Sequence, residues 1–443
     1  MRTSYIRAGV ASLLCAVAAP LDYAGQASYR IVRYMDRYDQ PSGFTEGSPG
    51  LFYGIAGSYT TVGFTITPEG SMTILVSYPT GYSIFSLFMG GYNGRFYSAA
   101  GAGNNPATVF SVMPVPGSER VYPPQNNWPT MTQTLPDGQM LAVAVGPGAT
   151  PWYVAKVDLN GTVKTIAQFP SGEYLPVVTY ADDGNYYGIS QTTFATTTTG
   201  YAFRVSPSGS VTKLYDFPGG WFNGQFSTPL FQAGDGDLYG AIPDGGANKQ
   251  GIIYKLTLDG EFTPLYTFPK TINGGPTALI EASDGNLYGV TLGSYNAGGV
   301  GQLFRVTKSG DYKLLHELSE PARDGACQCR FIQGSDGTFY GTAQGAGRTG
   351  AGAVFALDAG LPKPAPRLQE FTPKSGPAGT RVRLWGQNLL SASVQFNGAA
   401  ASAVSNSGPN YVWATVPAGA GSGPITVSTP GGASTTRVIF TVH

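Results

Sequence analysis

Side chains able to act as acids, bases or nucleophiles are few in this chain, and two of its 443 residues are histidines. Aligning LLHEL with KLYDF and PLYTF places His316 where the other segments carry Tyr215 and Tyr266. A position shared with two tyrosines indicates an outer-strand filler rather than a catalytic base. His443 is the last residue given, where chains fray. The sequence therefore predicts no Ser-His-Asp site.

Carboxylate chemistry of the glycosidase kind needs two acids on either side of the bond that is cleaved. Five aspartates occupy the same position of a recurring turn: Asp137, Asp183, Asp235, Asp284 and Asp336. Aspartate in such a turn caps its own backbone, so we interpret these side chains as structural. Catalytic acids, if present, must come from elsewhere.

Metal, cofactor and disulfide chemistry find little support. The pairs Asp182–Asp183 and Asp235–Asp237 lack the oxygen-rich loop that calcium requires, and Gly-rich GGANKQG lacks the phosphate-binding GxxxxGK[ST] pattern. Cys327 and Cys329 have no neighbouring histidine or second cysteine pair, so zinc is unsupported, and they are interpreted as a local disulfide or two idle thiols. We expect no metal and no cofactor.

The elements that must position any site are repeats. A hairpin signature, clearest as ASDGNLYGV (282–290), recurs with its glycine 44 to 52 residues after the previous one: Gly50, Gly94, Gly138, Gly184, Gly236, Gly285 and Gly337. Periods of this length indicate supersecondary units that cannot bury a core alone.

One unit, residues 276–318, contains four short alternating segments separated by turns, which is typical of a propeller blade. Three residues after the glycine stands a tyrosine in six units and Leu141 in the third, followed by glycine, alanine or serine. A large ring beside a minimal residue suits tight packing between sheets, so we expect core positions rather than a cofactor site.

The number of units can be checked at the chain's ends. After AVFALDAG (353–360) the prolines of LPKPAPRL forbid a central strand, so the seventh unit lacks its fourth strand. SYRIVRYMD (28–36) alternates like a fourth strand and has no first three before it. We therefore predict an all-β, seven-bladed β-propeller over residues 28–360, closed by the N-terminal strand, which also removes exposed sheet edges.

Loops on one face of such a ring are tight, whereas those on the other face are long. Long, variable loops on a rigid scaffold are where binding resides, and aromatic rings with amides suit sugar stacking or a protein contact. The predicted ligand-binding residues are Trp128, Trp221, Phe222, Asn223, Tyr295 and Arg348. The candidates for catalysis are Asp244, Arg323 and Asp324. The competing interpretation is that the tryptophans fill the loop layer.

The N-terminus predicts export. Arg2 and Arg7 precede the apolar stretch 8–19 and then small residues, the order of a signal peptide over residues 1–27. Twelve apolar residues are too few to span a bilayer, and we expect a secreted, periplasmic or cell-surface protein. Formal net charge is zero, with charged residues at 12%, which disfavours a nucleic-acid partner.

Two family resemblances follow from these motifs. The string DGNLYGVTLGSYNAGGVGQLFRVTKSGDYKLLHEL (284–318) resembles the bacterial GloVer tandem repeat, best in the last four units. That resemblance implies an exported bacterial protein and assigns no reaction. After a Pro-rich linker (361–367), the segment 368–443 resembles an IPT/TIG domain through LQEFTPKSGPAGTRVRLWGQNL and YVWATVPAGAGSGPITVSTPGGAS. This implies an immunoglobulin-like sandwich that acts as a spacer or interaction module.

Three functions remain open at this level. The first is a non-catalytic binding or adhesion protein that recognises a glycan or surface protein through the long-loop face. The second is a propeller-type polysaccharide lyase or glycosidase. The third is an inert surface scaffold. Convergence of loop carboxylates would distinguish an enzyme from a binding protein.

Overall fold

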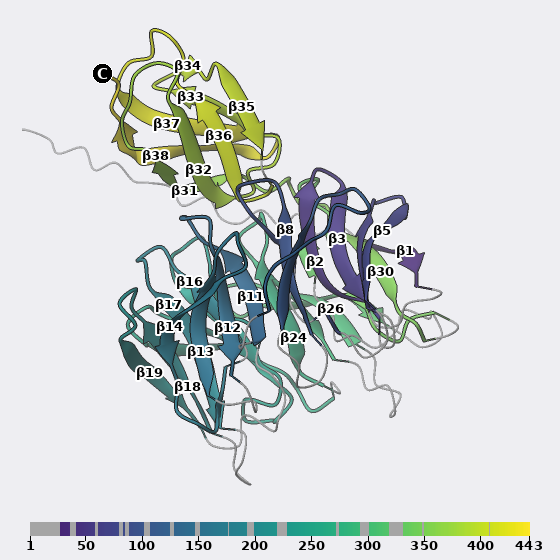
Figure 1. The fold of residues 1–443 in the computed structure, drawn as a ribbon. Coiled ribbons are helices and arrows are strands. Elements are labelled where there is room, and N and C mark those ends of the chain that lie inside the picture. The colour runs from purple at the N-terminus through teal and green to yellow at the C-terminus, as the bar shows by residue number, and fades with distance from the viewer. Residues whose placement is uncertain are drawn as a thin grey trace, which may run out of the picture.

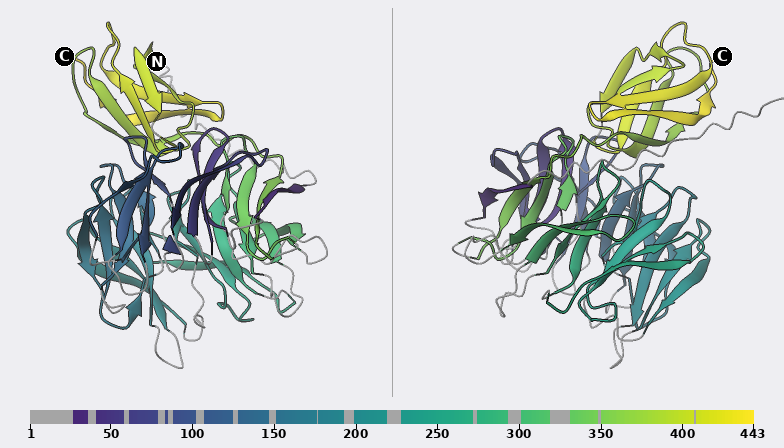
Figure 2. Two further views of the ribbon diagram at one scale, coloured as in Figure 1. Left: turned by 45° about the vertical axis from the view of Figure 1, so that its right-hand side comes forward. Right: turned by 180° about the vertical axis from the view of Figure 1, so that it is seen from behind.

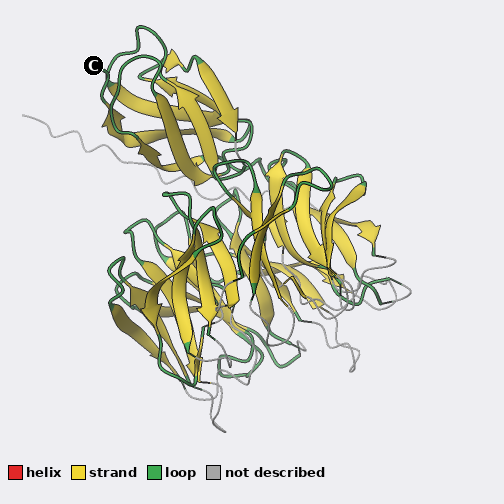
Figure 3. Cartoon of the chain, in the orientation of Figure 1, coloured by secondary structure: helices red, strands yellow, loops and turns green. Residues whose placement is uncertain are grey.

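The computed structural model describes residues 27–35, 41–57, 61–78, 83–84, 88–101, 107–124, 128–146, 151–175, 177–192, 199–218, 228–271, 274–292, 301–318, 331–347, 350–406 and 408–443. Every regular element in these residues is a β-strand, and no helix occurs among them (Figure 3). Correspondingly, the described part of the chain holds no helix able to cross a membrane.

Between residues 28 and 358 the described strands form seven antiparallel sheets arranged around a ring (Figure 1). The first three sheets contain β2 (Ser42–Ser48), β3 (Leu51–Ala56), β4 (Thr61–Ile66) and β5 (Met72–Tyr78); β6 (Ser83–Ile84), β7 (Met89–Gly90), β8 (Phe96–Gly101), β9 (Thr108–Val112) and β10 (Arg120–Val121); and β11 (Trp128–Thr134), β12 (Met140–Val145), β13 (Trp152–Val157) and β14 (Val163–Gln168). The next two contain β15 (Glu173–Tyr174), β16 (Val178–Tyr180), β17 (Tyr186–Thr192), β18 (Gly200–Val205) and β19 (Val211–Phe217); and β20 (Phe231–Gln232), β21 (Leu238–Ile242), β22 (Ile252–Leu256) and β23 (Phe262–Thr267). The last two contain β24 (Pro276–Glu281), β25 (Leu287–Thr291), β26 (Gly301–Val306) and β27 (Tyr312–Leu318); and β28 (Phe331–Gln333), β29 (Phe339–Ala343), β30 (Ala353–Asp358) and β1 (Ser28–Tyr34).

In the repeated Asp-Gly turn, one aspartate accepts hydrogen bonds both from the backbone of the turn and from the repeat tyrosine. In the sixth sheet, Asp284 Oδ1 accepts a hydrogen bond from the backbone N–H of Asn286 at 3.1 Å, and Oδ2 accepts one from the Tyr288 hydroxyl at 3.0 Å. Gly285 adopts φ 78°, which favours glycine. The same aspartate–tyrosine bond recurs at Asp183–Tyr187, Asp235–Tyr239 and Asp336–Tyr340. The predicted structural role of these aspartates is confirmed.

The small residue after the repeat tyrosine makes room for a ring on the neighbouring strand. A Cβ on Gly289 would lie 2.2 Å from the ring of Phe304, its cross-strand partner. Gly54 and Gly341 are covered in the same way by Phe64 and Phe355. The six repeat tyrosines are at most 2% exposed, so their predicted place in the core is confirmed. The glycine serves packing within one sheet rather than between sheets.

A glutamate or glutamine four residues before the repeat glycine joins its sheet to the turn of the preceding sheet. Its side-chain oxygen accepts a hydrogen bond from a backbone N–H of that turn, an interaction called here the clamp. Three clamps are Asp182–Gln232, Gly234–Glu281 and Ser283–Gln333, with nitrogen-to-oxygen distances of 2.8, 2.7 and 2.8 Å.

A fourth clamp links the first sheet to the last. Glu46 on β2 accepts hydrogen bonds from the backbone N–H and the hydroxyl of Ser335 at 2.7 and 2.8 Å, across 289 positions of sequence. Strand β2 also packs against β28 and β29. These contacts bring the first sheet against the last.

The N-terminal strand β1 pairs antiparallel with β30 and forms the outer edge of the last sheet, as the sequence predicted. Its Tyr29 stacks on His316 of the preceding sheet, with ring centroids 3.9 Å apart. Tyr215 stacks on Phe262 and Tyr266 on Tyr312 at equivalent places of earlier sheets. His316 is thus a member of an outer-strand ring series, as its alignment with two tyrosines indicated.

The C-terminal region forms a two-sheet sandwich. One sheet contains β31 (Arg367–Thr372), β32 (Arg381–Gln387), β36 (Tyr411–Thr415) and β35 (Ala403–Asn406); the other contains β34 (Ala399–Ala400), β33 (Ser393–Phe396), β37 (Gly423–Thr429) and β38 (Gly432–Phe440). Residues of both sheets, among them Leu384 and Val427, share one buried core. Figure 2 shows the sandwich at one end of the ring from two further sides.

The sandwich docks on the tight-turn face of the ring over the second, third and fourth sheets. The Trp413 indole donates to the Tyr92 carbonyl at 3.2 Å, and the Arg383 guanidinium donates to the Pro136 carbonyl at 3.1 Å. The Tyr411 hydroxyl donates to the carbonyl of Leu135. Further along, Arg367 and Gln369 both donate to the carboxylate of Asp182.

The predicted linker is also bound to the ring. Leu361 is 8% exposed, and the carbonyl of Pro362 accepts a hydrogen bond from the Ser283 hydroxyl at 2.6 Å. Ring, linker and sandwich are therefore joined by an extended polar interface, whereas a freely moving spacer would lack one.

The ring-closing clamp yields a stability prediction. E46A removes the acceptor of the Ser335 N–H and hydroxyl, and we expect it to lower the free energy of unfolding by about 2–4 kcal/mol. E46Q keeps an acceptor, as Gln232 and Gln333 do in other sheets, and should unfold in urea at a midpoint no lower than wild type at pH 7. E281Q, by contrast, should lower the urea midpoint, because it removes the carboxylate charge that pairs with Lys308 at 2.7 Å. Equal losses for E46Q and E46A would contradict the clamp.

The same residue gives a pH prediction. Burial raises the pKa of Glu46 above its ordinary value, more than its hydrogen bonds to Gly50 and Ser335 lower it. A raised folded-state pKa means that folding takes up a proton, so this group favours the fold more as the pH falls through that pKa. The stability of wild type relative to E46Q should therefore increase on acidification from pH 7. A flat difference in calorimetric unfolding temperature would argue against this.

Docking of the sandwich yields another prediction. Trp413 is half-buried against the ring, so W413A should destabilise the chain by about 2 kcal/mol, below the loss for a fully buried tryptophan. Differential scanning calorimetry should then show ring and sandwich separating into two transitions. V438A, exposed on β38 of the same sandwich, is the control. An unchanged thermogram for W413A would rule out energetic coupling through this contact.

Candidate functional site

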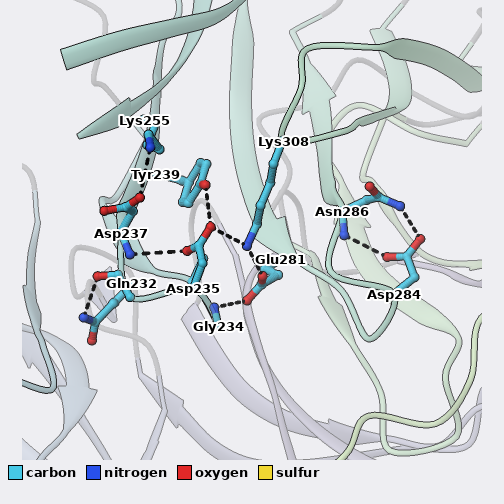
Figure 4. A network of polar contacts seen from close by, with 12 residues as sticks. Gln232, Gly234, Asp235, Asp237, Tyr239, Lys255, Glu281, Asp284, Asn286 and Lys308 are labelled. Carbon is cyan, nitrogen blue, oxygen red and sulfur yellow. Dashed lines mark hydrogen bonds and ion pairs between the residues drawn. The ribbon is translucent and has the colours of Figure 1, made fainter. Parts of the chain in front are cut away.

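The repeat-turn carboxylates on the tight-turn face form hydrogen bonds and ion pairs within the fold. Lys308 bridges Asp235 and Glu281 at 2.9 and 2.7 Å, and the Tyr239 hydroxyl also donates to Asp235 (Figure 4). Burial raises the pKa of Asp235, but the bonds from Lys308 and Tyr239 outweigh it, so the pKa lies below its ordinary value. A carboxylate that is ionised and accepts hydrogen bonds from two side chains is a poor general acid.

The neighbouring acid of this turn is occupied as well. Asp237 pairs with Lys255 at 3.0 Å (Figure 4). Two lysines therefore neutralise the Asp235–Asp237 pair, which leaves it unsuited to calcium because a cation site needs uncompensated oxygens. Among the described residues no group of three His, Cys, Asp or Glu side chains converges.

Most of the predicted site residues lie outside the part of the chain that the structure describes. They are Trp221, Phe222, Asn223, Tyr295, Arg323, Asp324 and Arg348, together with the side chain of Trp128 and the cysteines 327 and 329. The backbone of Trp128 begins β11. For these residues the predictions stand as the sequence made them.

Asp244 is the candidate that can be placed. It lies half-buried in the turn that follows β21, on the face opposite the tight turns. The loop is tightly packed, because a Cβ on Gly275 would lie 1.9 Å from the carbonyl oxygen of Pro243. Burial raises the pKa of Asp244, and no hydrogen bond or charge from the described residues offsets it. A carboxyl group of this kind can carry a proton at a higher pH than an exposed aspartate.

Two clefts lie where the ring meets the sandwich. The first, about 440 Å³, is bounded by the first and last sheets, the linker and the loop 387–391. Its walls carry amide side chains such as Gln387 and Asn410, and the loop holds Asn388 and Ser391 at φ 56° and 57°. Left-handed residues that are not glycine often mark functional loops. The second cleft is richer in charged groups.

Sequence reasoning missed this interface and the clamps. The clamps had a visible signal, since the position four before each repeat glycine is Glu or Gln in the first, fifth, sixth and seventh units and Gly90, Thr134 or Tyr180 in the others. The interface had none, because its donors Arg383, Tyr411 and Trp413 look like ordinary strand residues.

Three similar solved structures were found, and the first of them supports the fold. A catalytically inactive virginiamycin B lyase from Staphylococcus aureus, crystallised with quinupristin, matches with a TM-score of 0.50 at 13% identity and covers 75% of this chain and 99% of its own. A fungal alcohol oxidase with copper matches at TM-score 0.49 and 12% identity, covering 94% and 100%. A gluconolactonase from Xanthomonas campestris matches at 0.40 and 13%, covering 75% and 100%. At these identities the likeness extends to a β-propeller-like fold alone.

None of the curated proteins matches the sequence. A model of the Gloeobacter/Verrucomicrobia repeat matches residues 174–407. This span begins in the fourth sheet, at the first of the four units whose signature is well formed. The match covers more than half of the 443 residues. The chain therefore belongs to the Gloeobacter/Verrucomicrobia repeat family.

Proposed function

We propose that this chain is an exported, non-catalytic binding protein that recognises a glycan or a surface protein through the long-loop face of a seven-bladed propeller. The observation that carries the proposal is the docked sandwich, which covers the tight-turn face over three sheets. The opposite face carries the long connections, and such loops on a rigid scaffold form binding surfaces.

The blade count and the sandwich type belong to this proposal. Seven sheets, a Glu46–Ser335 clamp between first and last, and the pairing of β1 with β30 support a closed seven-bladed ring. Two packed sheets with one core support an IPT/TIG-type immunoglobulin-like sandwich. The order of charged, apolar and small residues over 1–27 supports export.

A binding role also accounts for how the described acids are used. Aspartates of the repeat turns bond to their own turn and to the repeat tyrosine, and Lys255 and Lys308 neutralise two neighbouring acids. Such groups hold the ring together, and the loops remain free to vary in sequence.

The test is retention without turnover. Protein lacking residues 1–27 is passed over cell-wall and environmental polysaccharides, and bound protein and released sugar are measured together. We expect retention on at least one polymer with no product, and about tenfold weaker retention for W221A, since stacking on one aromatic ring contributes up to about 1.5 kcal/mol. V211A, exposed on β19, is the control. Product release, or unchanged retention of W221A, would overturn the binding proposal.

One observation favours a carbohydrate-active enzyme as a second candidate. Asp244 has a pKa raised by burial, which a lyase or glycosidase acid requires, and Arg323 and Asp324 would supply further groups from the same face. Activity from such an acid should fall as the pH rises through the raised pKa, because the proton is lost.

For this candidate, D244N should lower any measured product release at least a hundredfold, the range expected for loss of a general acid. D259N, in a turn of the opposite face, should leave it unchanged. Equal rates for D244N and wild type would remove Asp244 from the reaction.

A further inference from the structure

The second cleft, called here the joint groove, lies between the third and fourth sheets and the sandwich. Its volume is about 460 Å³. The turn after β11 contributes Asp137, β13 contributes Lys156, the fourth sheet contributes Tyr180, and the sandwich contributes Glu370 and Trp385. Neither domain forms this groove alone.

The groove opens where the ring lacks a clamp. The position held by Glu or Gln in the first, fifth, sixth and seventh sheets is Tyr180 in the fourth, so no carboxylate or amide there reaches back to the preceding turn. Instead, Gln133 of the third sheet accepts a hydrogen bond from the Tyr180 N–H at 2.8 Å. The tyrosine ring then packs edge-on against Trp385, with centroids 5.9 Å apart.

The polar groups of the groove retain donors and acceptors for a ligand. Lys156 binds Asp137 at 2.8 Å and also interacts with Tyr186, which leaves one of its three N–H donors. Burial raises the pKa of Tyr180 to about 12, with Glu370 and Tyr186 adding to it, so its hydroxyl remains a donor at physiological pH. Glu370 is about half exposed and can accept.

A buried donor at this groove has no protein partner. The Trp385 side chain is 4% exposed, and its Nε1–H makes no hydrogen bond to any described group. An unpaired buried donor is unfavourable, and a native structure that keeps one calls for an explanation. The nitrogen is enclosed in the free protein, so a ligand hydroxyl would supply the acceptor once the Tyr180 and Trp385 rings shift apart on binding.

We propose that the joint groove binds a neutral saccharide of about two sugar rings. Sugar hydroxyls both donate and accept, which matches acceptors on Asp137 and Glu370 beside donors on Lys156, Tyr180 and Trp385. The face of a sugar ring suits the half-buried ring of Tyr180. Among the lining residues, the charges of Asp137 and Glu370 balance those of Lys156 and Arg383. The groove therefore carries no net charge to attract a charged sugar. The volume lies in the range of small-molecule pockets.

This site is separate from the long-loop face. No loop residue of that face lines the groove, and the groove depends on docking of the sandwich. A saccharide bound there would connect ring and sandwich, so it should also raise the unfolding temperature of the intact chain.

The test is isothermal titration calorimetry of the full chain without residues 1–27, using cellobiose, maltose, N,N′-diacetylchitobiose and, as a charged comparison, digalacturonate. We expect at least one neutral disaccharide to bind and digalacturonate to bind at least tenfold more weakly. W385F keeps the ring and removes the N–H, and should weaken binding about tenfold, the loss of one buried hydrogen bond.

The matched pair of variants is K156M and K255M. Both lysines stand one residue before the end of the third strand of their sheets and pair with a turn aspartate, but Lys255 is remote from the groove. K156M should weaken binding at least tenfold, and K255M should not change it. The proposal fails if no neutral disaccharide binds, if digalacturonate binds best, or if K156M and W385F both bind like wild type. W221A should leave this binding intact, which separates it from failure of the long-loop proposal.

Discussion

The fold depends on contacts between neighbouring sheets, because a single four-stranded sheet cannot bury both faces. The clamp is the polar part of that contact: a side chain from one innermost strand accepts the backbone N–H of the preceding turn. Between the fourth and seventh sheets three such clamps each join segments about 50 residues apart. Between Glu46 and Ser335 it joins segments 289 residues apart, so forming it costs about 1.5 kcal/mol more in loop-closure entropy. Closure, rather than any single sheet, is therefore the constraint that makes the ring one cooperative object.

The sandwich contacts the ring at the sheets whose clamp residues are missing. Gly90, Thr134 and Tyr180 occupy the clamp position in the second to fourth sheets, and the sandwich contacts the turns or inner strands of these same sheets. Its donors bond to backbone carbonyls of Tyr92, Leu135 and Pro136 at the turns. The sheets that lack the clamp residue are thus the ones that contact the C-terminal region.

The ring was predictable from sequence because its signals are local and repeated. Asp-Gly turns, the tyrosine that follows and the spare strand at 28–36 each have a physical meaning that does not depend on the partner, and the pairing of β1 with β30 confirms the last of them. The docking interface was not predictable, since Trp413 and Arg383 meet Tyr92 and Pro136 across more than 240 residues without a motif. For the site, Asp244 could be placed, and its raised pKa comes from burial that no sequence pattern reports. The aromatic loop residues remain predictions.

The two faces of the ring therefore differ in how strongly their side chains are fixed by contacts within the fold. On the tight-turn face the aspartates of the repeat turns are held by a backbone N–H, a tyrosine or a lysine, and a large part of that face supports the sandwich. A residue fixed by three bonds cannot vary without loss of stability, so new binding properties must arise where side chains are free of such duties. Two places satisfy this condition: the long connections of the opposite face, and the groove where Tyr180 replaces a clamp and the Trp385 N–H has no partner in the described part of the chain. The second lies where Tyr180 occupies the clamp position, and its walls come from both domains.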